Sequence, residues 1–183
     1  MINTTFGIFT IITVVVIIII AAITTTATAF SFLTSAFATA AEQKFTAKLF
    51  GDMEVPPVET NATGLAEFKP IQDENIVTYS LNVTDIDNVT AAHIHMGKQG
   101  QNGPIVVTLF KPDTPTEKMV TGLLSEGNIT TANLEGPLAG KQISDLTGSM
   151  LAVETYVNLH TAQHKDGEIR GQISNTTSGM MMK

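Results

Sequence analysis

Four histidines, the only ones in the 183-residue chain, fall into two short clusters, His93 with His95 and His160 with His164. Imidazole nitrogens bind copper, zinc, nickel and iron, so such clusters are typical of a transition-metal site. The chain has no cysteine, which excludes a zinc–thiolate site, a thiol nucleophile and a disulfide framework. Because copper stands highest in the affinity order for nitrogen ligands, we expect copper as the metal ion, with zinc as the second choice.

A predicted strand places the first pair of histidines. Side chains two residues apart in a strand point to the same face, so His93 and His95 can share one ion while Ile94 faces the core. His160 ends a second predicted strand, and His164 follows in the loop beyond it. The sequence therefore predicts a site built from His93, His95 and His160, with His164 as a fourth ligand or as a residue of its rim. Solvated surface histidines are the alternative interpretation.

Arg170 is the charged residue nearest to this group in the predicted arrangement. It alternates with apolar residues in a late strand, so it lies on the polar face together with Glu168. Two interpretations of Arg170 stay open. In the first it forms a structural salt bridge with Glu168 or Glu54. In the second it guides a small anion to the metal.

The elements that position these residues are predicted to be short strands separated by turn signals. The clearest apolar–polar alternation runs over 76–83. We expect an all-β, immunoglobulin-like or Greek-key sandwich of about eight strands within 44–174, and a short helical turn over 143–150 with Ser144 as its N-cap. The predicted strands cover 45–51, 63–69, 76–83, 89–96, 104–110, 123–130, 151–160 and 168–174.

The first 40 residues differ in composition from the rest of the chain. Glu42 is the first charged residue, and 6–23 is an uncharged, mainly apolar stretch about as long as a membrane span. Ala38-Thr39-Ala40 matches a signal-peptide cleavage pattern. Residues 1–40 are therefore predicted to be either a signal peptide or a membrane anchor at 6–23, and both place the domain outside the cytoplasm. Residues 175–183 are predicted to be a disordered, methionine-rich tail.

Charge and sequons bear on the partners of the domain. The net charge is −7 and no block of lysine or arginine occurs, so the sequence does not indicate nucleic-acid binding, which needs a basic surface. In an exported protein, Asn-x-Ser/Thr sequons are acceptors for glycans, although a chain rich in threonine and asparagine also produces them by chance. Such sequons occur at Asn3, Asn61, Asn82, Asn88, Asn128 and Asn175.

Three motifs, in the right order, resemble the CHRD domain, a family named after chordin. They are GDMEVPPV at 51–58 followed by ATG at 62–64, AHIHMG at 92–97 followed by NGPIVV at 102–107, and YVNLHT at 156–161 followed by GEIRGQI at 167–173. The resemblance implies an extracytoplasmic, immunoglobulin-like all-β domain over 44–174. It also implies that His93, His95 and His160 belong to the family pattern, whereas the position of His164 is commonly aromatic or apolar there.

A fainter resemblance is to copper-zinc superoxide dismutase, another Greek-key sandwich. In that family an H-x-H pair and a histidine from a late strand hold copper, and an arginine near the C-terminus guides superoxide. His93, His95, His160 and Arg170 occur in that order here, but the zinc-loop histidines, the bridging histidine and the disulfide have no counterpart. We expect an extracytoplasmic copper-binding protein with a role in copper handling or superoxide-dismutase-like chemistry. The alternative is a non-catalytic surface module that binds proteins or glycans.

Overall fold

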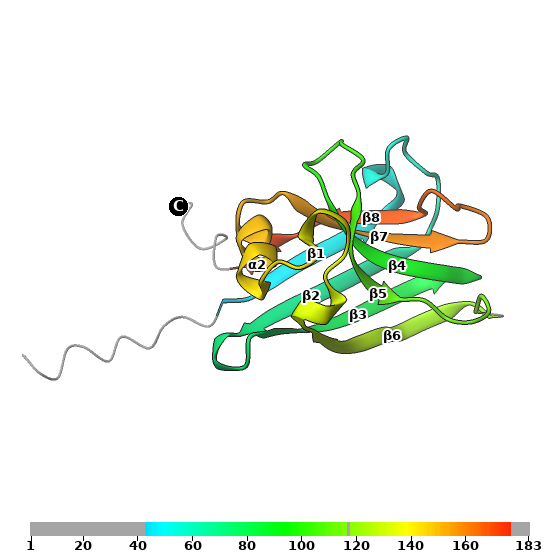
Figure 1. Cartoon of the computed structure of the whole chain (residues 1–183). Coiled ribbons are helices and arrows are strands. Elements are labelled where there is room, and N and C mark those ends of the chain that lie inside the picture. The colour runs from blue at the N-terminus through cyan, green and yellow to red at the C-terminus, as the bar shows by residue number, and fades with distance from the viewer. Residues whose placement is uncertain (1–42, 117, 177–183) are drawn as a thin grey trace, which may run out of the picture. The chain divides into compact units, whose positions relative to one another are not determined.

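The computed structural model describes residues 43–116 and 118–176, and these residues form a predominantly β-stranded domain (Figure 1). The all-β prediction is confirmed. The strands are β1 (Phe45–Phe50), β2 (Thr63–Ile71), β3 (Ile76–Ile86), β4 (Val89–Met96), β5 (Ile105–Phe110), β6 (Val120–Ile129), β7 (Thr155–Thr161), β8 (Ile169–Gln172) and β9 (Ser174–Asn175). Short 3₁₀ turns occupy Gly51–Met53, Gln72–Glu74, Thr131–Asn133 and Gly136–Leu138, and helix α2 covers Ile143–Leu151.

All nine strands belong to one antiparallel sheet whose order is β5-β4-β7-β8-β1-β2-β3-β6, with β9 also paired to β1. The middle of this order is its narrowest point, because the β1–β8 pairing consists of the single residue pair Phe50 and Arg170. The sheet therefore has two halves, β5-β4-β7-β8 and β1-β2-β3-β6. Buried residues of both halves, such as Ile94 and Leu81, belong to one hydrophobic cluster between them.

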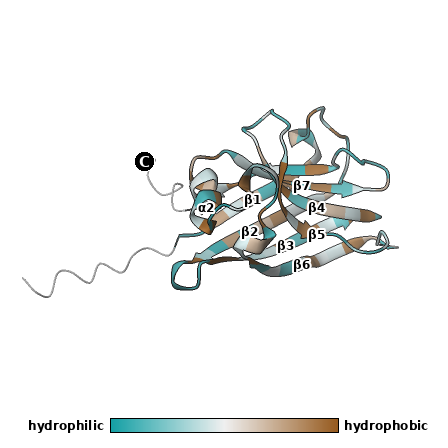
Figure 2. Ribbon diagram, in the orientation of Figure 1, coloured by the Kyte–Doolittle hydropathy of each residue, from teal (hydrophilic) through white to brown (hydrophobic). Residues whose placement is uncertain are grey.

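The core is built by alternation along the strands. In β4 the side chains of Ala92 and Ile94 are fully buried, and in β7 the same is true of Val157 and Leu159. Figure 2 shows apolar and polar residues alternating along several strands of the sheet. Since successive residues of a strand point to opposite faces, the residues between these core positions lie on the other face of the sheet.

Tyr79 of β3 links the two edge strands of the sheet. Its hydroxyl lies 2.6 Å from the carbonyl oxygen of Leu109 in β5 and 3.0 Å from the hydroxyl of Ser125 in β6. Ser125 also donates to the Leu109 carbonyl, at 2.8 Å. The edges are thus joined by side-chain hydrogen bonds and come close to closing the sheet, as the neighbouring β5 and β6 in Figure 1 indicate.

Helix α2 and the strand that follows it differ from the sequence-based prediction. Helix α2 has two full turns, and its N-cap is Gln142, whose backbone N–H donates to Asp145 at 2.8 Å; Ser144 lies inside the first turn. The helix continues to Leu151, so the strand expected from that residue begins only at Thr155.

The C-terminal boundary of the domain also differs from the prediction. Asn175, expected to begin a disordered tail, belongs to β9 and pairs with Phe45. The predicted leader at 1–40 and the tail from 177 lie outside the described residues. Within the described part of the chain, no helix is long and apolar enough to cross a membrane.

We predict that Tyr79→Phe lowers the free energy of unfolding by about 1 kcal/mol, because it removes the hydroxyl that joins β3 to β5 and keeps the ring. Urea unfolding of Tyr79→Phe, Ser125→Ala and the double variant measures this contribution. The shared acceptor at Leu109 predicts non-additive effects of the two substitutions. Strictly additive losses would show that the two hydroxyls act independently.

Candidate metal centre

The histidines of the first cluster lie on the outer face of β4, beside the matching face of β7. The pairing register sets Ala91 opposite His160, His93 opposite Asn158, and His95 opposite Tyr156. Figure 1 shows β4 and β7 side by side in the sheet. The register brings residues from two distant parts of the sequence to one patch of the outer face.

Irregularities of the neighbouring strand β5 accompany this patch. The ladder between β4 and β5 skips Leu109 between the pairs Ala92–Phe110 and His93–Thr108, and it skips Val106 between the pairs at Ile94 and His95. Such bulges bend a strand and change the direction of side chains nearby, and they are common beside functional sites.

Three imidazole rings converge on this patch. The ring centroids of His93 and His160 are 5.0 Å apart, those of His93 and His95 are 5.7 Å apart, and those of His95 and His160 are 6.0 Å apart. One ring nitrogen of each histidine lies within 4.8 Å of those of the other two. Nitrogen ligands of a tetrahedral ion with bonds of 2.0–2.1 Å are about 3.3 Å apart, so modest ring rotations suffice to close the group on a metal ion.

Backbone carbonyls determine which ring nitrogens are free to bind an ion. Nδ1 of His95 lies 2.9 Å from the carbonyl oxygen of Gly103, and Nδ1 of His160 lies 2.9 Å from that of Lys165. Because a carbonyl oxygen only accepts hydrogen bonds, Nδ1 carries the proton in each ring and Nε2 keeps its lone pair. The buried ring nitrogens without a partner are Nε2 of His95, Nε2 of His160 and Nδ1 of His93.

The rings are neutral at neutral pH. Burial, followed by the charges of His160 and His95, lowers the pKa of His93 from 6.5 to about 4. The pKa values of His95 and His160 are also lowered, chiefly by burial and against the effect of their carbonyl partners. Glu135 and Lys111 act on His93 in opposite directions, the carboxylate favouring its protonated form and the ammonium group opposing it. A neutral imidazole keeps one nitrogen lone pair, which is the form that ligates a transition metal.

His164, the expected fourth ligand, is not brought to the other three. It lies outside the group of histidines whose nitrogens approach within 4.8 Å. Its backbone organises the loop after β7 instead: the His164 N–H donates to the Thr161 hydroxyl at 3.1 Å, and its carbonyl accepts from the N–H groups of Thr161 and Gly167 at 3.2 Å. The structure therefore brings three of the four histidines together and leaves His164 outside their group.

Arg170, expected to guide an anion or to form a salt bridge with Glu168 or Glu54, lies buried beside the site. Burial lowers its pKa, and the charges of Tyr156 and Glu54 oppose that shift. Arg170 is 2% exposed, so little of its surface is open to an anion arriving from solvent. Its hydrogen bonds go to Asn102 and to the carbonyls of Lys98 and Gln101, at 2.9, 3.3 and 2.6 Å. The carboxylate of Glu168 accepts instead from two threonine hydroxyls, those of Thr60 and Thr161.

A second buried polar pair lies beside the histidines. Glu54 is 5% exposed and Asn158, next to His93 in the ladder, is 3% exposed. Oε1 of Glu54 and Oδ1 of Asn158 both lack a hydrogen-bond partner and both lie against Gly167, where a Cβ atom would collide with them. Burial raises the pKa of Glu54 from 4.5 to about 7, although the charge of Arg170 opposes the shift. A protonated Glu54 that donates to Asn158 would satisfy both oxygens.

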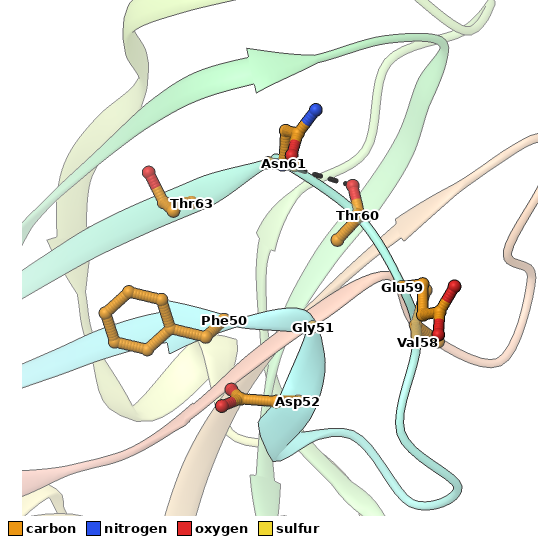
Figure 3. A pocket seen from close by; sticks show the side chains of 9 residues that line it. Phe50, Gly51, Asp52, Val58, Glu59, Thr60, Asn61 and Thr63 are labelled. Carbon is orange, nitrogen blue, oxygen red and sulfur yellow. Dashed lines mark hydrogen bonds between the residues drawn. The ribbon is translucent and has the colours of Figure 1, made fainter.

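A hollow of about 620 Å³ lies elsewhere, between the end of β1 and residues 58–63 (Figure 3). No histidine lines it, and its two carboxylates, Asp52 and Glu59, point in different directions. Active-site pockets have a few polar groups that converge on one point. Size therefore does not identify the candidate site of this protein, whereas the convergence of the three imidazoles does.

Fold and site together define a class of protein: an all-β domain in which three histidines converge on the outer face of two paired strands. Residues 45–173 match the model of the CHRD domain, and the chain belongs to this family. The match confirms the resemblance seen in the sequence motifs. No curated protein and no solved structure matches the chain, and nothing in these comparisons supports the similarity to copper-zinc superoxide dismutase.

Several residues that support the site carried only a weak signal in the sequence. Tyr156 and Asn158 precede His160 by four and two residues, so strand parity alone assigns them to the same face. The carbonyls of Gly103 and Lys165 carry no signal at all, because every residue has one. Loop conformation, which side-chain patterns do not encode, places these two acceptors.

We predict that Glu54→Gln removes a pH dependence of stability. A carboxyl group whose folded pKa is raised stabilises the fold fully below pH 4.5, and this contribution is lost as the pH rises through about 7. The wild-type free energy of unfolding should therefore fall relative to that of Glu54→Gln, by on the order of 2 kcal/mol after solvent screening is considered.

Urea unfolding between pH 4.5 and 8 measures this difference, and the histidine titrations that both proteins share cancel in it. Glu59→Gln, at an exposed position, serves as the control and should follow the wild type. Parallel profiles for the wild type and Glu54→Gln would contradict the assignment of a buried, protonated Glu54.

Proposed function

We propose that this CHRD domain is an extracytoplasmic metal-binding protein that holds one copper ion, with zinc as the second choice, through Nδ1 of His93 and Nε2 of His95 and His160. Two observations carry the proposal: one ring nitrogen of each of the three histidines lies within 4.8 Å of the other two, and each of the three rings has a buried nitrogen without a hydrogen-bond partner. A buried polar atom without a partner costs about 1–3 kcal/mol, and here three neighbouring rings each have one. A cation that accepts all three lone pairs removes that cost.

The donor set favours copper. All three donors are imidazole nitrogens and the chain has no thiolate, so the set lacks the soft sulfur ligands of structural zinc sites. Cu(II) binds nitrogen ligands more tightly than the other divalent ions of the first transition row. Three protein ligands also leave a coordination position for an outside molecule, which is the arrangement of catalytic rather than structural sites.

Two further parts of the proposal depend on the bound ion and on the leader. Copper would supply one-electron chemistry, so the role is copper handling or superoxide-dismutase-like oxidoreduction. The residues at 1–40, as a signal peptide or as an anchor at 6–23, would deliver the domain to the outside of the cytoplasm, as membership of the CHRD family also implies.

A protein- or glycan-binding module remains the second candidate function. The side chains of Phe50, Met53, Val55 and Leu65 are exposed by 37–42% and lie on β1, on the segment that follows it and on β2. Exposed apolar residues that lie near one another often mark interaction surfaces.

We predict that the full chain, produced without an affinity tag, binds one equivalent of Cu(II). His93→Ala, His95→Ala and His160→Ala should each weaken binding by on the order of 100-fold or more, beyond the 10–100-fold that loss of an outer partner costs. His164→Ala is the matched control and should bind like the wild type, because His164 lies outside the group. Isothermal titration with Cu(II) and with Zn(II), together with metal analysis, measures the result. Failure of the wild type to bind either ion in stoichiometric amount would refute the proposal.

The redox part of the proposal has its own measurement. We predict that the copper-loaded chain consumes superoxide faster than the metal-free chain and than the buffer with the same copper chelated, and that His160→Ala loses this gain. Pulse-radiolysis or stopped-flow decay of superoxide provides the rates. Copper binding with a decay rate equal to that of the controls would leave copper handling as the role.

A further inference from the structure

Arg170 is a buried cation that does not belong to the ligand group. The hydrogen bonds of its guanidinium group run to the loop 97–103 between β4 and β5: two to the carbonyls of Lys98 and Gln101 and one to the side chain of Asn102. A buried arginine is costly unless its donors are satisfied, so this loop conformation and the position of the guanidinium group depend on each other. The loop is therefore tied to β8.

Tyr156 separates Arg170 from the histidines. The strand order β4-β7-β8 sets Tyr156 of β7 between His95 of β4 and Arg170 of β8. The rings of His95 and Tyr156 are nearly parallel, at 10° with centroids 5.0 Å apart, and the guanidinium carbon lies 3.4 Å from the Tyr156 ring centroid. Tyr156 thus has an imidazole on one side and a cation on the other, and a shift of Arg170 moves the surface on which His95 rests.

Gly103 is where the loop meets the metal site. Its carbonyl oxygen lies 2.9 Å from Nδ1 of His95, and its N–H donates to the hydroxyl of Tyr156 at 3.1 Å. A Cβ atom at Gly103 would run into the carbonyl of Met96, so the loop passes the end of β4 at a distance that only glycine allows. Arg170 holds the residue just before Gly103 through its bond to Asn102.

We propose that Arg170 is a positioning residue of the metal site: by clamping the loop 97–103 it holds the Gly103 carbonyl on His95, which keeps the proton on Nδ1 and leaves Nε2 free for the metal ion. The proposal rests on the role of His95 as a ligand, proposed above, for its functional meaning. It does not depend on that role for its structural test. It replaces the anion-guiding role expected of Arg170 with one that acts through the backbone.

His160 provides an internal control for this proposal. Its Nδ1 is held by the carbonyl of Lys165, in the loop between β7 and β8, and not by the loop that Arg170 clamps. Loosening the clamp should therefore change the tautomer of His95 and leave that of His160 unchanged. A general loss of structure would change both.

Nitrogen-detected or long-range ¹H–¹⁵N NMR of the metal-free full chain reads the tautomer of each ring. We expect the Nδ1–H form for His95 and His160 in the wild type, and a mixture of the two tautomers for His95 alone in Arg170→Lys. Lysine keeps the charge but lacks the planar fork that reaches several acceptors and stacks on an aromatic ring. Retention of the pure Nδ1–H form at His95 in a folded Arg170→Lys variant would overturn the proposal.

Asn102 offers a second route to the same test if the buried Arg170 does not tolerate replacement. Asn102 is exposed, and Asn102→Ala removes the one side chain that accepts from Arg170. Asn102→Asp keeps the acceptor oxygen and, like the alanine variant, loses the bond from Asn102 to the carbonyl of Val55. We expect a mixed His95 tautomer in Asn102→Ala but not in Asn102→Asp. Equal behaviour of the two variants would overturn the clamp.

Metal affinity gives the functional readout. Removal of a partner that orients a metal-binding histidine typically weakens binding by about 10- to 100-fold, so we expect a loss of this size for Cu(II) in Arg170→Lys. An unchanged affinity in a variant whose His95 tautomer has changed would overturn the positioning role. If the wild type binds neither Cu(II) nor Zn(II), the proposed function fails, while the tautomer measurement still decides the clamp.

Discussion

The register between β4 and β7 is the constraint on which the rest of the molecule depends. One face of this strand pair supplies Ile94 and Leu159 to the core, and the other carries His93, His95 and His160. A slip by one residue would exchange the two faces, exposing the core residues and burying imidazoles among aliphatic side chains. The hydrophobic contacts that stabilise the sandwich thereby also hold the histidines in place, and no separate interaction is needed to bring them together.

Burial affects the protonation of the polar residues on the outer face of β4 and β7 and beside it. The imidazoles are neutral, and the pKa of Glu54 is raised to about 7. The guanidinium group of Arg170 donates to backbone carbonyls and stacks on the ring of Tyr156. Arg170 disfavours protonation of His95, and it favours ionisation of Glu54. A metal ion bound by these histidines would add positive charge to a group of neutral rings.

Much of this arrangement could be predicted from periodicity. Alternation identified the strands, and the spacing of His93 and His95 placed both on one face, because side-chain direction in a strand follows from position alone. Chain order could not place His164, since a loop residue has no such constraint. The role of Arg170 could not be predicted either. Strand parity placed it correctly on the polar face, but its burial depends on loop 97–103, which folds over it. The carbonyls that fix the tautomers have no side-chain signature, so only the folded backbone reveals them.

The pairing of the last strands with the first has a consequence for how the domain reaches its final form. β8 and β9 join the two halves of the sheet by pairing with β1, so residues 169–175 must be available before the sheet is complete. Contacts between the two ends of a chain form slowly, because a long loop must close first. The two histidines of β4 are synthesised well before His160. A nascent chain that has not reached His160 therefore carries only two of the three histidines that converge in the folded domain.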